Sequence, residues 1–216
     1  MSCDILFEDF QVIPRLTELS LPKEVMLEIF EQALGERANV TASDPITTPG
    51  TEMWRWTTRF LRDSSELRER GWVACRYSQI DGIRNDELKI KLVVINTDSH
   101  TGMPSKMPRN SAQKGPAAEM LVRNNFQRDQ GTLFKDESQL NDPVTHYDFW
   151  YFCVHTGENY VSAEISRPDL IVARTIRSFT ERLILCKPGE MDGFSPRQPV
   201  PEDFAEIEQP AITRKH

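Results

Sequence analysis

The sequence predicts an α+β fold, in which a mostly antiparallel sheet of about five strands, made of two hairpins and one further strand, carries three helices on one face. Five segments have the alternating or continuous apolar pattern of strands, and three others repeat apolar residues at helical spacing. Their order is helix, helix, hairpin, loop, helix, hairpin, strand. Because short turns join the strands of each hairpin, these strands are expected to pair in antiparallel fashion.

Residues that favour helix starts and stops delimit the predicted helices. The first is expected over residues 22–34, since its leading proline suits a first turn and Gly35 favours an end. The second begins near Thr51, which can cap a helix N-terminus, and continues to about residue 70. The third opens at Pro116 and carries apolar residues on one face.

The first hairpin is predicted over residues 72–80 and 87–96. Its second strand changes from an alternating pattern to the continuous apolar run Leu92 to Ile95, which is typical of a central strand. The last strand is expected within residues 176–186, where a charged start leads into an apolar run.

Aromatic residues are concentrated in the second predicted hairpin, residues 147–167. Its strands flank a four-residue turn that contains Gly157, and both faces of its first strand are apolar. Two interpretations follow. The strand is central and covered on both faces, or one face meets another chain, as in a homodimer.

The length and composition predict a single α+β domain over residues 1–186. Residues 187–216 contain five prolines and several acids, so we expect a tail that is partly disordered or lies on the body. The N-terminus is acidic where a signal peptide is basic, and no apolar run is long enough to cross a bilayer. A cytoplasmic protein without membrane contact is therefore expected.

Charge limits the function classes. The net charge of −7 argues against a general nucleic-acid coat protein, because phosphate affinity comes mainly from lysine and arginine. The four cysteines form no CxxC pair, and three lie inside apolar runs, as small buried residues do. No resident cofactor is indicated by any motif, and the sequence leaves open whether the protein is an enzyme.

The polar segment 97–116 is the longest predicted loop, and it is locally basic. It contains Lys106, Arg109 and Lys114 against a single acid, and Arg123 and Arg128 follow on the next predicted helix. Loops of this length in a compact domain are usually functional or disordered. The leading hypothesis is a binding or regulatory protein that engages a protein or nucleic acid through this loop, and also through the aromatic hairpin.

The first hairpin also carries a carboxylate followed by a carboxylate-x-lysine: Asp81, Glu87 and Lys89. Divalent cations that assist phosphodiester hydrolysis need clustered oxygen ligands. With the preceding helix and the following one, residues 50–130 resemble the core of the PD-(D/E)xK nuclease superfamily. The resemblance implies that Asp81 and Glu87 bind Mg²⁺ and that Lys89 is catalytic. Ile80 stands where the family has proline, and Glu87 lies at the end of its strand.

The second predicted helix carries arginines opposite its apolar face. Arg55 and Arg59 lie there at helical spacing, together with Arg62. They form either a solvated surface or a stripe that faces phosphate. In the nuclease alternative, Arg55 or Arg59 would contact the phosphate of the substrate.

Overall fold

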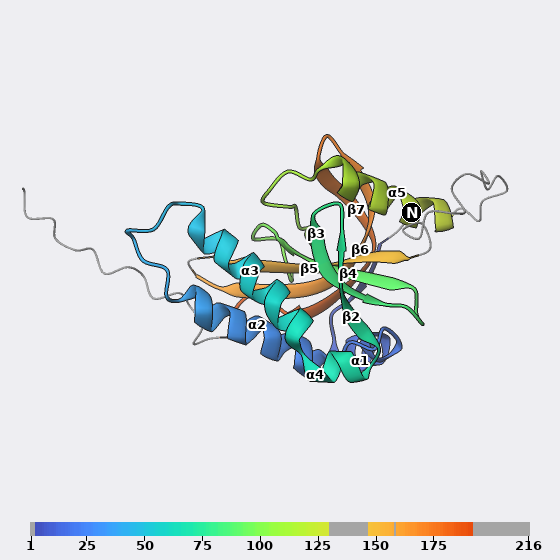
Figure 1. The fold of residues 1–216 in the computed structure, drawn as a ribbon, viewed down its shortest axis with the longest axis horizontal. Coiled ribbons are helices and arrows are strands. Elements are labelled where there is room, and N and C mark those ends of the chain that lie inside the picture. The colour runs from blue at the N-terminus through green and yellow to red at the C-terminus, as the bar shows by residue number, and fades with distance from the viewer. Residues whose placement is uncertain (1–2, 130–146, 158, 192–216) are drawn as a thin grey trace, which may run out of the picture.

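The computed structural model describes residues 3–129, 147–157 and 159–191 (Figure 1). A seven-stranded sheet in the order β1-β7-β6-β5-β4-β3-β2 forms its centre. The strands are β1 (Asp4–Leu6), β2 (Trp72–Tyr77), β3 (Ile80–Asn85), β4 (Ile90–Asn96), β5 (Asp148–Thr156), β6 (Val161–Val172) and β7 (Thr175–Cys186). Strand β1 pairs with β7, and β4 with β5, in parallel orientation, and the other neighbouring strands pair in antiparallel orientation.

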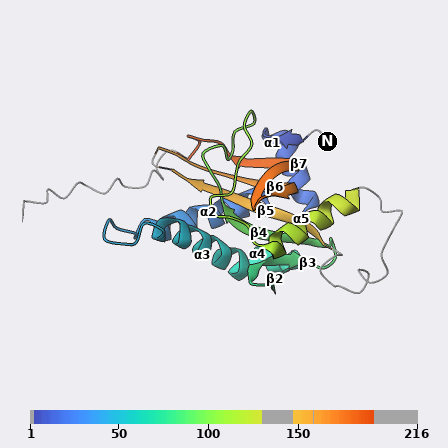
Figure 2. The ribbon, with the colours of Figure 1, turned by 90° about the horizontal axis from the view of Figure 1, so that it is seen from above.

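Helices cover both faces of this sheet. They are α1 (Asp9–Glu18), α2 (Lys23–Arg37), α3 (Thr48–Asp63), α4 (Ser65–Glu69) and α5 (Pro116–Asp129). Helices α1 to α4 pack on one face, whereas α5 packs on the other, so the molecule has three layers (Figures 1 and 2). The β4–β5 crossover passes through α5, which explains why those two strands are parallel.

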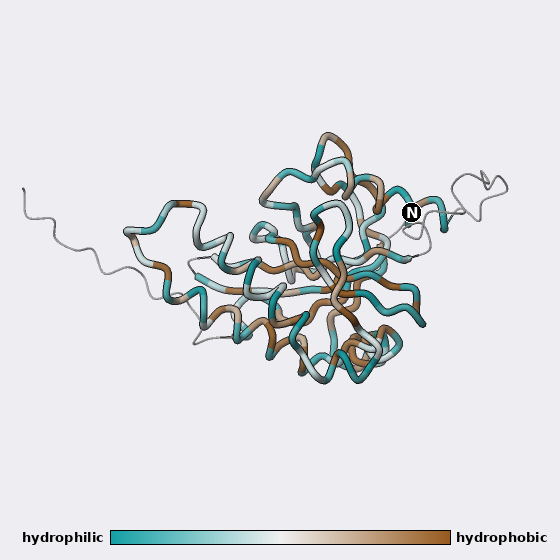
Figure 3. Tube along the Cα trace, viewed as in Figure 1, coloured by the Kyte–Doolittle hydropathy of each residue, from teal (hydrophilic) through white to brown (hydrophobic). Residues whose placement is uncertain are grey.

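The core follows from the alternation of side chains along β4 and β5. Leu92 and Phe152 face the layer of α1 to α4, and Val93 and Tyr151 face α5. Apolar segments accordingly gather along the middle of the sheet in Figure 3. Each large apolar side chain buried this way contributes about 1.5–3 kcal/mol, so the two central strands anchor the fold.

The aromatic strand is central. Phe149, Trp150, Tyr151 and Phe152 are each at most 1% exposed, because helices or loops cover both faces of β5. The structure therefore confirms the central-strand interpretation. The expectation that the aromatic hairpin offers a partner surface is wrong for Phe149 to Val154 of β5, whose side chains are buried.

The α+β class is confirmed, but several details differ from the sequence prediction. The sheet has seven strands rather than five and is mixed, and helices lie on both faces rather than one. The first hairpin is a three-stranded meander, because Ser78 and Gln79 adopt positive φ angles and turn β2 into β3. Helix α2 continues past Gly35, where the sequence predicts its end, to Arg37. A Cβ added at Gly35 would have no neighbouring atom within 4 Å, so nothing there requires glycine.

The chain ends give less information. Strand β7 ends at Cys186, as expected, and Lys187 then forms ion pairs with Glu8 and Glu190. Residues 192–216, most of the predicted tail, lie outside the described residues. Within the described ranges, no helix combines the length and apolar character that crossing a bilayer requires.

Candidate functional site

The loop between β4 and α5 has a defined conformation despite its irregular backbone. A bridge joins Thr97 to Asn110, and the Asp98 carboxylate accepts hydrogen bonds from the backbone N–H groups of His100 and Arg109. The buried Thr101 hydroxyl donates to the Thr97 hydroxyl at 2.7 Å. These contacts close the loop at its base.

A fully buried ion pair fixes the loop to the sheet. The Arg182 guanidinium of β7 is bound to the Glu164 carboxylate of β6 at 2.6 and 2.8 Å, and both side chains are at most 2% exposed. Arg182 also donates to the backbone carbonyls of Lys106 and Met103 at 2.7 and 3.3 Å. The backbone N–H of Gly102 donates to Glu164 at 2.8 Å. The desolvation of a buried pair is offset only when its remaining hydrogen bonds are made. Here the loop makes three of them, and the Ser166 hydroxyl of β6 donates a further one to Glu164.

Gly102 is required where the loop approaches the sheet. Its φ of +73° lies in the left-handed region, and an added Cβ would lie 2.7 Å from the Cys186 carbonyl oxygen. A side chain at this position would therefore push the loop away from Glu164.

The fixed loop presents cations to solvent. Lys106 and Arg109 are exposed, and neither has a carboxylate partner among the described residues. The β6–β7 turn is joined to the loop, because the Arg174 carbonyl accepts from the Lys114 N–H and the Asn110 side chain. The exposed Arg174 and Arg177 flank this junction. Lys106, Arg109, Arg174 and Arg177 are called the basic loop surface below.

The other predicted partner-binding residues lie elsewhere. The Lys114 ammonium is half-buried, 5.5 Å from the centre of the Tyr151 ring, and desolvation lowers its pKa to about 8. Arg123 is exposed in the middle of α5. Arg128 lines a cavity with Asp129 and Asp148. Of the predicted partner-binding residues, Lys106 and Arg109 are thus exposed on the loop, whereas Lys114 is half-buried and Arg128 lines a different cavity.

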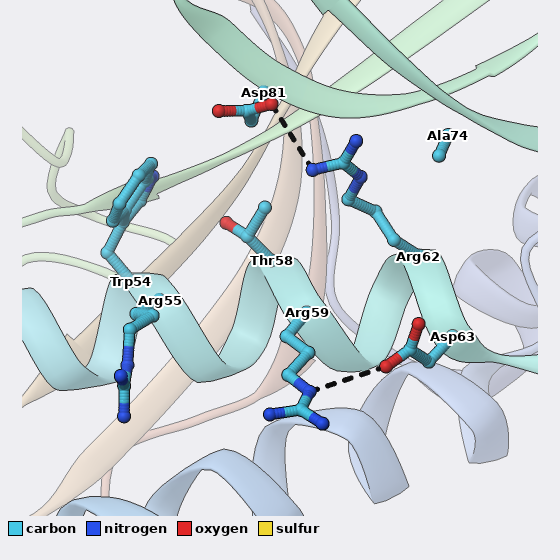
Figure 4. A pocket seen from close by; sticks show the side chains of 8 residues that line it. All are labelled: Trp54, Arg55, Thr58, Arg59, Arg62, Asp63, Ala74 and Asp81. Atoms are coloured by element: carbon cyan, nitrogen blue, oxygen red, sulfur yellow. Dashed lines mark hydrogen bonds and ion pairs between the residues drawn. The ribbon is translucent and has the colours of Figure 1, made fainter.

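A groove of about 490 Å³ lies between α3 and the β2–β3 hairpin (Figure 4). Arg62 points into it and binds Asp81 at 3.2 Å, whereas Arg55 and Arg59 point away from Asp81. Arg55 and Arg59 instead pair with Glu52 and Asp63, and both guanidinium groups lie over the Trp56 ring. These two predicted phosphate ligands are therefore neutralised locally.

The nuclease residues do not converge. Asp81 is the second residue of β3 and is held by Arg62 and Arg76, whereas Glu87 lies in the turn beyond the other end of β3. At about 3.3 Å per residue, the four strand steps from Asp81 to Asn85 alone span about 13 Å. Lys89 lies in that same distal turn, with its ammonium 5.6 Å from the Tyr147 ring centre.

The nuclease resemblance implies a helix, a hairpin and a helix, and the structure has α3, the three-stranded meander β2–β4 and α5 in that order. However, the part of β4 that lies near Asp81 is Val93 to Ile95, which offers no second carboxylate. In the described ranges, no group of three or more histidine, cysteine or acidic residues is arranged to hold a metal ion. The residues named for Mg²⁺ therefore do not form one site.

Comparisons with known proteins do not assign the chain. No family model matches it, and the curated proteins and solved structures searched contain no significant match.

Proposed function

We propose that this protein binds nucleic acid through the basic loop surface. The observation that carries the proposal is the buried Arg182–Glu164 pair, which donates to and accepts from the backbone of loop 97–116 and holds it in one conformation. Cations on a fixed loop lose little conformational entropy when an anionic partner binds.

The charge arrangement favours phosphate as the bound anion. The four cations of the basic loop surface have no carboxylate partner among the described residues, so their attraction for an anion is not cancelled locally. Arg55 and Arg59 on α3, by contrast, are already paired with acids. The net charge of −7 repels a polyanion from the rest of the molecule and restricts contact to this surface.

The test compares two variants of equal charge. Lys106→Ala/Arg109→Ala and Arg55→Ala/Arg59→Ala each remove two positive charges, one pair from the loop and the other from α3. Fluorescence anisotropy with a labelled single-stranded oligonucleotide and its duplex would be measured between 50 and 200 mM salt. Four phosphate contacts give a slope of log affinity against log salt of about −3 for a single strand.

The loop variant is expected to reduce that slope to about −1.5, since two contacts are lost, and the α3 variant to leave it near −3. Equal effects of the two variants would contradict the assignment of the surface. No binding of either nucleic acid at 50 mM salt would contradict the assignment of the partner. If an acidic peptide binds the loop while the oligonucleotide does not, the partner is a protein instead.

The nuclease alternative is not proposed as a second function. Its carboxylates Asp81 and Glu87 lie at opposite ends of β3, and Asp81 is already paired with two arginines. A Mg²⁺ site with in-line hydrolysis requires ligands that converge.

A further inference from the structure

A cavity opens where β3 and β4 diverge. The two strands pair only between Ile83–Asn85 and Ile90–Leu92. Beyond that register, a cavity of about 380 Å³ separates Ile80 and Asp81 from Val93 to Ile95. Residues 113–118, at the start of α5, close one side.

The cavity contains two polar groups that lack an acceptor or a counter-ion. The Tyr151 side chain is 1% exposed, and its hydroxyl has no hydrogen-bond partner among the described residues. The Lys114 ammonium lies over the Tyr151 ring and has no carboxylate partner in the described ranges. A buried donor without an acceptor and a half-buried cation without a counter-ion both cost free energy, which an acceptor anion would recover.

The N-terminus of α5 adds to the attraction of the cavity for an anion. Pro116 is its first residue and, with Ala117 and Ala118, lines the cavity. The first turn of a 14-residue helix attracts negative charge. Three features from different segments, an ammonium, a hydroxyl donor and a helix start, therefore favour an anion in the same place.

Apolar side chains line much of the rest of the cavity, together with the polar Ser78, Gln79 and Gln113. Ile80, Val93, Ile95 and Phe149 line the space beside the polar groups. We propose that this cavity binds a small organic acid, with one anionic group toward Lys114 and Tyr151 and an apolar body against these walls. This site is separate from the basic loop surface, so it does not depend on the proposed function.

The charges around the cavity restrict the ligand to a single negative charge. Asp81 also lines the cavity, and although Arg62 and Arg76 hold it, its carboxylate repels a second anionic group. Of the groups that face Lys114 from β5, burial raises the pKa values of both Tyr151 and Cys153, so both stay neutral donors at pH 7. Lys114, with a pKa of about 8, stays mostly protonated there.

Two probes that differ only in charge test the proposal. Titration calorimetry of 2-naphthoate and of neutral 2-naphthamide would be performed at pH 7 on wild type, Lys114→Met, Tyr151→Phe and the loop control Lys106→Met. The control removes the same charge from a lysine outside the cavity. Melting temperatures would establish that each variant folds.

Wild type is expected to bind the acid about tenfold to a hundredfold more tightly than the amide, which is the range of one charge-assisted hydrogen bond. Lys114→Met should abolish that preference, Tyr151→Phe should reduce it, and Lys106→Met should preserve it. At pH 8.5, binding of the acid should take up protons, seen as heats that depend on the buffer. Equal binding of acid and amide by wild type, or no saturable binding of the acid, would overturn the proposal even if a variant fails to fold.

Discussion

Replacing Arg182 with methionine should both destabilise the protein and release the loop. The substitution leaves the Glu164 carboxylate, which is 0% exposed, without its counter-ion and removes the donors to two loop carbonyls. Breaking a buried pair from one side costs about 3–5 kcal/mol. For a chain of this size, that corresponds to a fall in melting temperature of about 10 °C.

A double variant separates stability from loop order. Arg182→Met/Glu164→Leu replaces the pair with apolar side chains and is expected to recover most of the lost stability, because no charge remains buried. The loop carbonyls and the Gly102 N–H still lose their partners, so the loop should remain released. Urea unfolding followed by circular dichroism would measure stability, and hydrogen exchange of residues 98–110 would measure loop order.

Loop amides that exchange as slowly in the double variant as in wild type would show that the ion pair does not fix the loop. A loss of stability below about 1 kcal/mol in the single Arg182→Met variant, which is the range of an exposed pair, would contradict the role of a buried pair.

Three further predictions concern individual side chains. Lys114→Met should be more stable than wild type at pH 7 but not at pH 10.5. The folded-state pKa of Lys114, about 8, lies below the ordinary lysine value of 10.5. Between these two pH values the unfolded wild type binds more protons than the folded protein, so the stability of wild type rises with pH there. Asn125→Ala should lose about 3 kcal/mol in urea unfolding, because the buried Asn125 makes three hydrogen bonds to the backbone of β5 and β6. The side-chain amide nitrogen of Asn124 has no partner in the described part of the chain, so Asn124→Ala should lower the free energy of unfolding by less than about 1 kcal/mol. Gly102→Ala should lower the free energy of unfolding by about 1–2 kcal/mol or more and accelerate hydrogen exchange across the loop. Exchange as slow as in wild type would show that Gly102 does not approach the sheet closely.

The sequence predicts the layers of this fold better than its connections. Apolar runs identify β4 and β5 as central strands because their burial on both faces is a local property of the residues. The β2–β3 turn is missed, since Ser78 and Gln79 adopt left-handed angles that only tertiary contacts impose on residues of these types. The displaced strand boundary then places Asp81 and Glu87 on one hairpin turn, when they lie at opposite ends of β3.

The candidate site was predictable only in outline. Length, proline content and charge identify loop 97–116, but they do not distinguish the exposed Lys106 from the half-buried Lys114. Glu164 and Arg182 are not among the predicted site residues, although each is a charge inside an apolar strand, which signals a buried pair. Which charges pair depends on the β6–β7 register, and bulges shift that register in ways the sequence pattern does not show.

Hydrogen exchange with and without a single-stranded oligonucleotide tests the central claim most directly, because it locates the bound surface without any substitution. We expect the oligonucleotide to slow exchange in residues 98–114 and 173–177 and to leave exchange in α3 unchanged. Protection of α3 with none in the loop, or no protection anywhere at low salt, would contradict it.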